Sequence, residues 1–441
     1  RQKVSLSLLK KDAETGKPLE GVVFGLYAQE DIKNAAGEVV VEKDALIELG
    51  TTDEEGKLVF QADLPHGKYY IQEVEHKPGY LPNDEVYSFD ASYTDQTLEL
   101  LAFSEEISNQ PTITEFTKVD LTGGQEIEGA KMQILDQEGK VVEEWVSKKE
   151  AHVVYALAPG EYILHEEQAP TEQGYVRAED VKFVVEETGD VQKVKMEDDH
   201  TKVSISKTDI TDGKEIEGAK LQILDQDGEV VESWTTGEEH LIEYLPVGTY
   251  TLHEEAAVDG YIVANDVEFT VEETGEIQKV KMEDERAMGQ LVIVKTDTDS
   301  KAALEGVEFV LLEKETGKEV GRLKTGKDGK AVSELLPIGT YENGVFKEPI
   351  TYVLKETATL KGYEKTEEEW EIVFTYQNDK TPVIEVVKEI QNKKIPETPG
   401  TVKPGPKTGD DTNWFLPLLA LGVSAGMVAG LLYYRKRHKK A

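Results

Sequence analysis

The sequence predicts an all-β protein of four tandem, Ig-like Greek-key β-sandwich modules, followed by a linker and one transmembrane helix. The main observation is a stretch, LPVGTYTLHEEAAVDGY at residues 245–261, that occurs four times. Recurrence of this kind is typical of an array of similar modules. The other copies are LPHGKYYIQEVEHKPGY from Leu64, LAPGEYILHEEQAPTEQGY from Leu157, and one from Leu336 that is interrupted after Tyr341 and resumes at Tyr352.

Each copy lies in a segment with the pattern of several short strands. Runs rich in Val, Ile, Tyr and Thr alternate with period two and are separated by turn signals such as DQEG, DQDG and ETGD. We place modules 1 to 4 at residues 1–110, 111–199, 200–285 and 286–394. Modules 2 and 3 are sister copies, because GQEIEGAKMQILDQEGKVVEEW is nearly repeated as GKEIEGAKLQILDQDGEVVESW. Several strands in a segment of this length favour a small β-sandwich or Greek-key barrel.

The composition excludes several classes of function. The chain of 441 residues carries 88 acidic and 49 basic residues, a formal net charge of −39, whereas nucleic-acid binders have a basic footprint. It contains no cysteine, which excludes disulfides, thiolate metal sites and cysteine nucleophiles. We expect no cofactor and no metal. His165 and His253 are out of phase with the inner strand face, and the DQEGK and DQDGE segments lack the ligand ladder of a calcium loop.

A glutamate recurs on the inner face of the repeated stretch. Tyr250, Leu252 and Glu254 share one face of the predicted strand, because side chains alternate between the two faces. A carboxylate directed into an apolar interior needs a partner. The equivalent residues of the other modules are Glu73, Glu166 and Glu356.

A lysine and a late Asn or Asp recur with the same parity. The first predicted strand of each module ends in Lys-x-Asp, at Lys10, Lys118, Lys207 and Lys295, and the last strand offers Asn109, Asp198, Asp284 and Asn392. In module 4, Asn378 has acceptable parity too, but the EISN and EIQN contexts of the outer modules favour Asn392.

These three residue types are those that an intramolecular amide bond requires. Burial lowers the pKa of an amine and raises that of a carboxylic acid, so a neutral amine can attack while the acid polarises the acceptor carbonyl and shuttles protons. An Asn acceptor would expel ammonia and an Asp acceptor water. The alternative is a buried ion pair, or strand ends that point into solvent. Recurrence of the same triple in four modules favours the covalent interpretation.

The order Lys-x-Asp, then Tyr-x-Leu-x-Glu leading to Gly-Tyr, then a late Asn or Asp, resembles the collagen-adhesin B-type repeat. This repeat, also called the SpaA-like prealbumin fold, occurs in Gram-positive surface proteins and pilins. The resemblance covers nearly all of residues 1–394. It implies a transthyretin-like β-sandwich with an autocatalytic isopeptide bond in each module. YVLKETATLKGY fits the family's acidic-box pattern best, YIQEVEHKPGY lacks its Thr, and the Asp acceptors are a less common variant.

The C-terminal segment has the features of a surface anchor. Residues 395–413 are a Pro/Gly-rich linker, residues 414–434 are apolar and long enough to cross a bilayer, and residues 435–441 are basic and expected in the cytoplasm. Pro406, Lys407, Thr408 and Gly409, followed by this span, resemble a cell-wall sorting signal, although Gly405 stands where the family has Leu. The resemblance implies cleavage after Thr408 by a sortase and transfer of the Thr408 carbonyl to peptidoglycan or a pilin amine.

Together these features predict an extracellular, cell-wall-anchored stalk that spans the membrane before sorting. The chain begins at Arg1 without Met, so we expect either a C-terminal piece of a longer precursor or a processed product, with any host extracellular ligand bound by a region upstream. Two alternatives are a polymerised pilus subunit and an adhesin whose modules bind a host ligand directly. A turnover enzyme is not expected, because the reactive groups would be consumed once.

Overall fold

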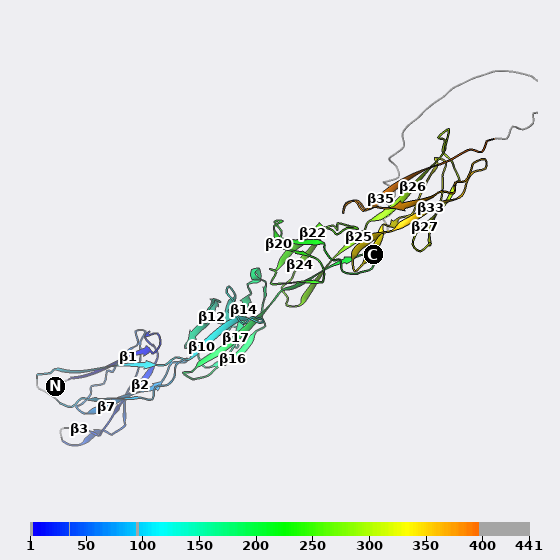
Figure 1. Ribbon diagram of the computed structural model, residues 1–441. Coiled ribbons are helices and arrows are strands. Elements are labelled where there is room, and N and C mark those ends of the chain that lie inside the picture. Colours follow the sequence, from blue (N-terminus) through cyan, green and yellow to red (C-terminus); the bar gives the residue numbers. More distant parts are fainter. Residues whose placement is uncertain (1–2, 35, 94–96, 397–441) are drawn as a thin grey trace, which may run out of the picture.

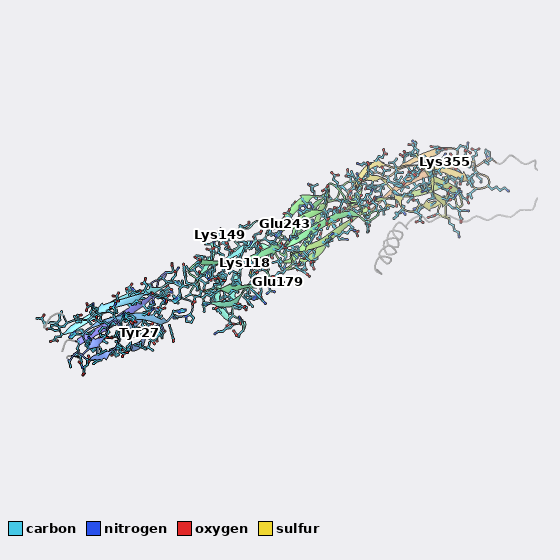
Figure 2. The ribbon with its side chains drawn as sticks, turned by 90° about the horizontal axis from the view of Figure 1, so that it is seen from below. Tyr27, Lys118, Lys149, Glu179, Glu243 and Lys355 are labelled. Carbon is cyan, nitrogen blue, oxygen red and sulfur yellow. The ribbon has the colours of Figure 1, made fainter. Side chains whose placement is uncertain are left out.

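The protein is an extended row of four β-sandwich modules. The computed structural model describes residues 3–34, 36–93 and 97–396. Figure 1 shows the modules following one another from blue to orange, and Figure 2 shows the same row after a turn of 90°. Both views show an elongated molecule. The regular elements are strands apart from one short 3-10 helix in the described residues, so the all-β prediction is confirmed.

Module 1 is built from two sheets and a small hairpin. One sheet has the order β6-β1-β9, the other β5-β2-β7-β8, and β3 pairs with β4. The strands are β1 (Lys3–Asp12), β2 (Val23–Ala28), β3 (Ile32–Lys33), β4 (Val39–Val41), β5 (Leu46–Thr51), β6 (Lys57–Val59), β7 (Lys68–Glu75), β8 (Val86–Asp90) and β9 (Leu100–Asn109).

Modules 2 and 3 have the same topology as each other. The sheets are β13-β10-β17-β15 and β12-β11-β14-β16 in module 2, and β21-β18-β25-β23 and β20-β19-β22-β24 in module 3. The elements of module 2 are β10 (Ile113–Asp120), β11 (Lys131–Leu135), β12 (Val141–Val146), β13 (His152–Tyr155), β14 (Gly160–Gln168), the 3-10 helix η1 (Thr171–Gln173), β15 (Tyr175–Val176), β16 (Val181–Val185) and β17 (Val191–His200). Those of module 3 are β18 (Lys202–Asp209), β19 (Lys220–Leu224), β20 (Val230–Thr235), β21 (His240–Glu243), β22 (Gly248–Ala256), β23 (Tyr261–Ile262), β24 (Val267–Val271) and β25 (Ile277–Arg286).

Module 4 adds a hairpin to this plan. In one sheet β26 pairs with β29, β30 and β35, the other sheet is β28-β27-β33-β34, and β31 pairs with β32. The strands are β26 (Met288–Asp297), β27 (Glu308–Glu313), β28 (Glu319–Lys324), β29 (Lys330–Val332), β30 (Leu336–Pro337), β31 (Gly339–Glu342), β32 (Val345–Pro349), β33 (Thr351–Ala358), β34 (Glu369–Val373) and β35 (Val383–Asn392).

The first and last strands of every module are parallel neighbours. In module 1, β1 pairs with β9 so that Asp12 lies opposite Asn109 and Lys10 opposite Ile107. The pairs β10·β17, β18·β25 and β26·β35 have the same direction and the same two-residue offset between lysine and acceptor. Because side chains alternate along a strand, this offset puts the lysine and the acceptor diagonally next to each other on the same face.

The core of each module lies between its two sheets. Inward residues of β1, such as Leu6 and Leu8, pack against Phe24 of β2 and Ile71 of β7, and all four are almost completely buried. At about 25 cal/mol per Å² of apolar surface, burial of such side chains supplies the main driving force for each sandwich. The strand that carries the lysine and the strand that carries the glutamate therefore face each other across this core.

The Gly-Tyr end of the repeated stretch forms the junction with the next module. Gly79, Gly174 and Gly260 have positive φ angles of 88°, 79° and 88°, which favour glycine. An added Cβ at these positions would lie 2.2 Å from Ala156 O, 2.3 Å from Tyr244 O and 2.7 Å from the Phe346 ring, all in the following module. At Gly362 of module 4, an added Cβ has no neighbour within 4 Å among the described residues. Close inter-module contact thus explains why the first three positions need a small residue.

The hairpin β31–β32 of module 4 contacts module 3. It accounts for the interruption of the fourth copy after Tyr341. The Tyr341 hydroxyl donates a hydrogen bond of 2.7 Å to Gly260 O, and the Arg286 guanidinium lies 4.2 Å from the centre of the Tyr341 ring. Arg286 also forms ion pairs with Asp209 and Asp212 at 2.6 and 2.9 Å. The inserted hairpin is therefore an inter-module contact.

The predicted anchor lies outside the described residues. This applies to most of the linker 395–413, to Pro406, Lys407, Thr408 and Gly409, and to the predicted span 414–434. Within residues 3–34, 36–93 and 97–396, no helix has the length and apolar character needed to cross a membrane.

Candidate cross-linking sites

The structure brings lysine, glutamate and asparagine together inside modules 1 and 4. In module 1, Lys10 Nζ lies 2.9 Å from Glu73 Oε2 and donates a hydrogen bond to Asn109 Oδ1. Asn109 Nδ2 donates to Glu73 Oε1 and Oε2 at 2.8 and 3.0 Å. The lysine comes from the first strand, the acceptor from its parallel neighbour, and the glutamate from β7 of the opposite sheet.

Module 4 repeats this arrangement with one additional partner. Lys295 Nζ lies 3.0 Å from Glu356 Oε2 and donates to Asn392 Oδ1. Asn392 Nδ2 donates to Glu356 Oε1 at 2.6 Å and to Thr359 Oγ1 at 2.7 Å. Asn378, the alternative acceptor, instead lies in an exposed turn where its Oδ1 accepts from the Lys380 amide at 2.9 Å. The structure therefore places Asn392, and not Asn378, next to Lys295.

In modules 2 and 3 the acceptor is an aspartate. Lys118 Nζ lies 3.0 Å from Glu166 Oε2 and contacts Asp198 Oδ1. Lys207 Nζ lies 2.9 Å from Glu254 Oε2 and contacts Asp284 Oδ1. In all four modules the lysine exposes 4% or less of its surface. Figure 2 labels Lys118 within the body of module 2.

Each aspartate site holds one ammonium and two carboxyl groups, so charge balance requires one proton on the acid pair. Four buried carboxyl oxygens have no hydrogen-bond partner in the described part of the chain: Glu166 Oε1 and Asp198 Oδ2 in module 2, and Glu254 Oε1 and Asp284 Oδ2 in module 3. A proton on one acid supplies a donor for the other and avoids an uncompensated buried charge. Burial raises the pKa of Asp198 and of Asp284 to about 7; the lysine ammonium opposes this shift and the neighbouring Glu adds to it.

The lysines of modules 1 and 4 are shifted toward the neutral amine. Burial lowers the pKa of Lys10 and of Lys295, because the charged form loses its hydration, while the hydrogen bond and charge of the adjacent glutamate oppose the shift. Transfer of one proton from lysine to glutamate leaves both groups neutral. That state contains an uncharged amine in contact with an amide carbonyl oxygen.

The glutamates of modules 1 and 4 lie on the nitrogen side of the acceptor amide. From the sequence we expect this acid to polarise the acceptor carbonyl, but Glu73 and Glu356 accept hydrogen bonds from Nδ2 instead, while the lysine contacts Oδ1. The acid is thus placed to protonate the leaving nitrogen. This detail depends on how the strands approach in space, which the sequence pattern alone does not specify.

A phenylalanine beneath the lysine was not predicted from the sequence. Phe24 lies opposite Glu73 in the sheet, with Lys10 Nζ 5.4 Å from its ring centre. Phe309 has the same position in module 4, with Lys295 Nζ at 5.9 Å. The ring covers one side of the lysine nitrogen with apolar surface and forms a cation–π contact with its charged form. Met132 and Leu221 occupy this position in modules 2 and 3.

The aspartate of Lys-x-Asp joins the first strand to the Gly-Tyr segment. Asp12 Oδ1 accepts from the amides of Glu14 and Thr15 at 2.8 Å each, and its Oδ2 accepts from Tyr80 OH at 2.8 Å. In module 3, Tyr261 OH donates to Asp209 Oδ2 at 2.7 Å. In module 2, Asp120 hydrogen-bonds to Tyr175 of its own Gly-Tyr segment and also accepts from Tyr244 of module 3 at 2.8 Å. In module 4, Asp297 hydrogen-bonds to Tyr363. Its recurrence two residues after each lysine is the signal that could have identified it.

The two histidines discounted as metal ligands lie on the outer strand face. His165 Nδ1 is 2.7 Å from Asp180 Oδ1, and His253 Nδ1 is 2.7 Å from Asp266 Oδ1. Each pair joins a strand to the residue directly before its neighbouring strand, β16 or β24, at the surface.

The chain matches one protein family over most of its length. The profile described as SpaA, prealbumin-like fold domain, matches residues 4–103, 112–200, 201–286 and 289–349. The chain belongs to this family. The first three matched segments follow modules 1 to 3, and the fourth covers the first part of module 4. The resemblance expected from the sequence is confirmed at the level of family and fold.

The chain also matches several solved structures at low identity. The Bacillus anthracis TIE protein has 22% identity and a TM-score of 0.45, with 89% of this chain and 73% of that chain covered. A streptococcal ancillary pilin has 16% identity and a TM-score of 0.27, with 65% and 99% covered. BcpA, the major pilin subunit of Bacillus cereus, has 14% identity and a TM-score of 0.28, with 65% and 100% covered. Among curated proteins, none matches this sequence.

Proposed function

We propose that this chain is the stalk of a Gram-positive surface protein, in which an isopeptide bond between the first and last strands braces each module. The observation that carries the proposal is the fourfold contact between a buried lysine Nζ and the Oδ1 of an Asn or Asp on the parallel neighbouring strand. A glutamate oxygen lies within 2.9 to 3.0 Å of the same nitrogen in each module. Membership of the SpaA family supports the β-sandwich fold in which these contacts occur.

The chemistry balances in both kinds of module. In module 1, Lys10 gives one proton to Glu73, and its Nζ bonds to Cγ of Asn109. The Cγ–Nδ2 bond then breaks and Nδ2 leaves with the transferred protons as an ammonium ion, which restores the glutamate. In module 3, Lys207 bonds to Cγ of the neutral acid Asp284, and a water molecule and one proton leave. The glutamate acts as a proton shuttle within hydrogen-bond reach of the reacting groups.

The reaction consumes its own groups, so we propose a single-turnover event and not an enzyme with a separate substrate. The first reason is the arrangement itself, because nucleophile, shuttle and acceptor all belong to one module. The second is access, since the lysine of each site exposes 4% or less of its surface.

Wall anchoring through Thr408 is the second part of the proposal. It is supported by the sequence of Pro406, Lys407, Thr408 and Gly409 before an apolar run and a basic tail. In this proposal a sortase cleaves after Thr408 and links its carbonyl to peptidoglycan outside the cell. A sortase reaction with a glycine peptide as nucleophile should release the segment after Thr408 from the wild-type chain, and the Thr408→Ala chain should stay intact.

The intact mass of fragment 1–394 under denaturing conditions tests the cross-links. Four bonds with the acceptors assigned here remove two ammonia and two water molecules, and tryptic mapping should find Lys10 joined to Asn109 and Lys207 to Asp284. The matched control replaces all four lysines by arginine, which keeps the charge but lacks a competent amine. An unshifted wild-type mass would leave buried ion pairs and end the proposal of covalent bracing.

A further inference from the structure

The acceptor of module 4 has a hydrogen-bond partner that has no counterpart among the described residues of the other modules. Thr359 Oγ1 accepts from Asn392 Nδ2 at 2.7 Å, on the same nitrogen that donates to Glu356 Oε1 at 2.6 Å. Thr359 comes three residues after the glutamate, directly after strand β33. The equivalent residues are Ala169 and Ala257 in modules 2 and 3 and His76 in module 1. His76 Nε2 lies 2.8 Å from Glu187 of module 2, away from the module 1 acceptor.

From this contact we propose that Thr359 is a positioning residue that orients the Asn392 amide toward Lys295. The inference rests on the proposed cross-linking function and adds a residue to one site. Two acceptors, Glu356 and Thr359, take the two protons of Nδ2, so the amide plane is fixed with Oδ1 at the lysine. In module 1, by comparison, Asn109 Nδ2 donates to the two oxygens of Glu73.

The role of Thr359 follows from the order of proton transfers. Lys295 contacts Glu356 Oε2, whereas Asn392 Nδ2 donates to Oε1, so the transferred proton arrives on Oε2. The neutral acid then has one donor and one acceptor and can turn either toward the amide, so it no longer fixes the orientation of the amide by itself. Thr359 Oγ1 remains an acceptor for Nδ2, so the amide keeps its carbonyl at the amine while the acid turns its proton toward the leaving nitrogen.

The same hydroxyl favours Asn over Asp at position 392. Toward an aspartate, the Thr359 hydroxyl would turn and donate, and a hydrogen bond to a carboxylate favours its ionised form. The ionised carboxylate is the poorer acceptor for an amine. We therefore infer that Thr359 assists an amide acceptor and hinders an acid acceptor, which separates this role from general support of the fold.

The test measures how fast module 4 closes in the full chain, with module 1 as an internal reference. The chain is synthesised in a cell-free system with detergent, quenched in denaturant at intervals and digested. The cross-linked Lys295–Asn392 and Lys10–Asn109 peptides are then quantified by mass spectrometry. One neutral hydrogen bond changes a rate by about three- to tenfold. Thr359→Val should slow module 4 by this factor without slowing module 1, and Thr359→Ser should restore the rate.

The decisive comparison uses Asn392→Asp as a second background. In that chain Thr359→Val should leave the rate unchanged or raise it, because the hydroxyl no longer holds an amide. Equal slowing by Thr359→Val in the wild-type and Asn392→Asp backgrounds would show a structural role only, and an unchanged rate in the single Thr359→Val chain would also overturn the proposal. Neither result affects the cross-link itself. Absence of the Lys295–Asn392 peptide from the wild-type chain would instead refute the proposed function of module 4.

Discussion

Replacing Glu254 by Gln should prevent the cross-link of module 3 while leaving its charges balanced. The substituted amide cannot carry a proton from Lys207 to the leaving oxygen, so the chain should keep one water molecule that the wild type loses. Asp284 would then ionise and remain as the partner of Lys207, which it already contacts. The expected loss of stability is therefore mainly the loss of the covalent closure.

The magnitude follows from the length of the closed loop. Lys207 and Asp284 are 77 residues apart, and the chain-entropy relation derived for disulfides gives about 4.5 kcal/mol for such a loop. For a module of this size, that corresponds to a fall of about 20 to 35 °C in the midpoint of thermal unfolding. Stepwise heating with a protease, followed by peptide mapping, assigns the midpoint to module 3 and leaves the other modules as internal controls.

The matched control is Asp284→Asn, which keeps a competent acceptor and should still form the bond, with loss of ammonia in place of water. Two results would refute the reasoning. A Glu254→Gln chain that loses water like the wild type would show that no glutamate shuttle is needed. A chain that keeps its water but melts within a few degrees of the wild type would show that closure is not the source of stability.

Three further perturbations test the electrostatics and the junctions. Because the pKa of Asp284 is about 7, its neutral fraction falls about fivefold between pH 7 and 8. Module 3 should therefore close more slowly relative to module 1 over this range, as measured from both cross-linked peptides in one quenched sample. Tyr261→Phe removes a hydrogen bond to the buried carboxylate of Asp209 and should cost module 3 about 1 to 3 kcal/mol in urea unfolding. Tyr341→Ala removes the ring beneath Arg286, a contact worth about 0.5 to 2 kcal/mol, and should broaden the distribution of end-to-end distances in small-angle scattering without changing the melting of module 4.

The sequence predicts which residues face the core, because side chains two positions apart on a β-strand lie on the same face. Lys207 shares parity with Val203 and Ile205, both of which are buried, and Asp284 shares it with the buried Met282. Once a segment is known to be a strand, a spacing of two fixes the side on which each residue lies. The same rule identifies Glu254 through Tyr250 and Leu252 of the repeated stretch.

Pairing between distant strands is what the sequence pattern does not specify. Lys10 and Asn109 are 99 residues apart, and their contact depends on a parallel register with a two-residue offset between β1 and β9. Likewise, Tyr80 reaches Asp12 from 68 residues away, and Tyr341 reaches across a module boundary. Such contacts arise from the packing of whole sheets, so local periodicity contains no signal for them. Repetition across modules is the only indirect sign, as with the aspartate of Lys-x-Asp.

The position of the proposed bonds would determine which part of each module carries tension. The chain enters module 1 at the start of β1 and leaves it at the end of β9, and these strands run parallel. Lys10 lies near the C-terminal end of β1, and Asn109 is the last residue of β9. Tension that enters β1 would therefore pass through the bond at Lys10 directly to Asn109 and into β10, which begins at Ile113.

Everything between the two linked residues is then outside the path of the force. The second sheet and the loops of module 1 belong to the 99-residue separation that the proposed bond would bypass, and the other three bonds would bypass 80, 77 and 97 residues. A bonded module could extend under tension only by stretching its first strand. In an unbonded module, the hydrogen bonds between β1 and β9 would have to resist the tension. Because the acceptor is close to the exit of the chain, almost no segment of the module after the bond is left to unravel. The position of the triple is thus what the proposed role as a stalk under tension would require.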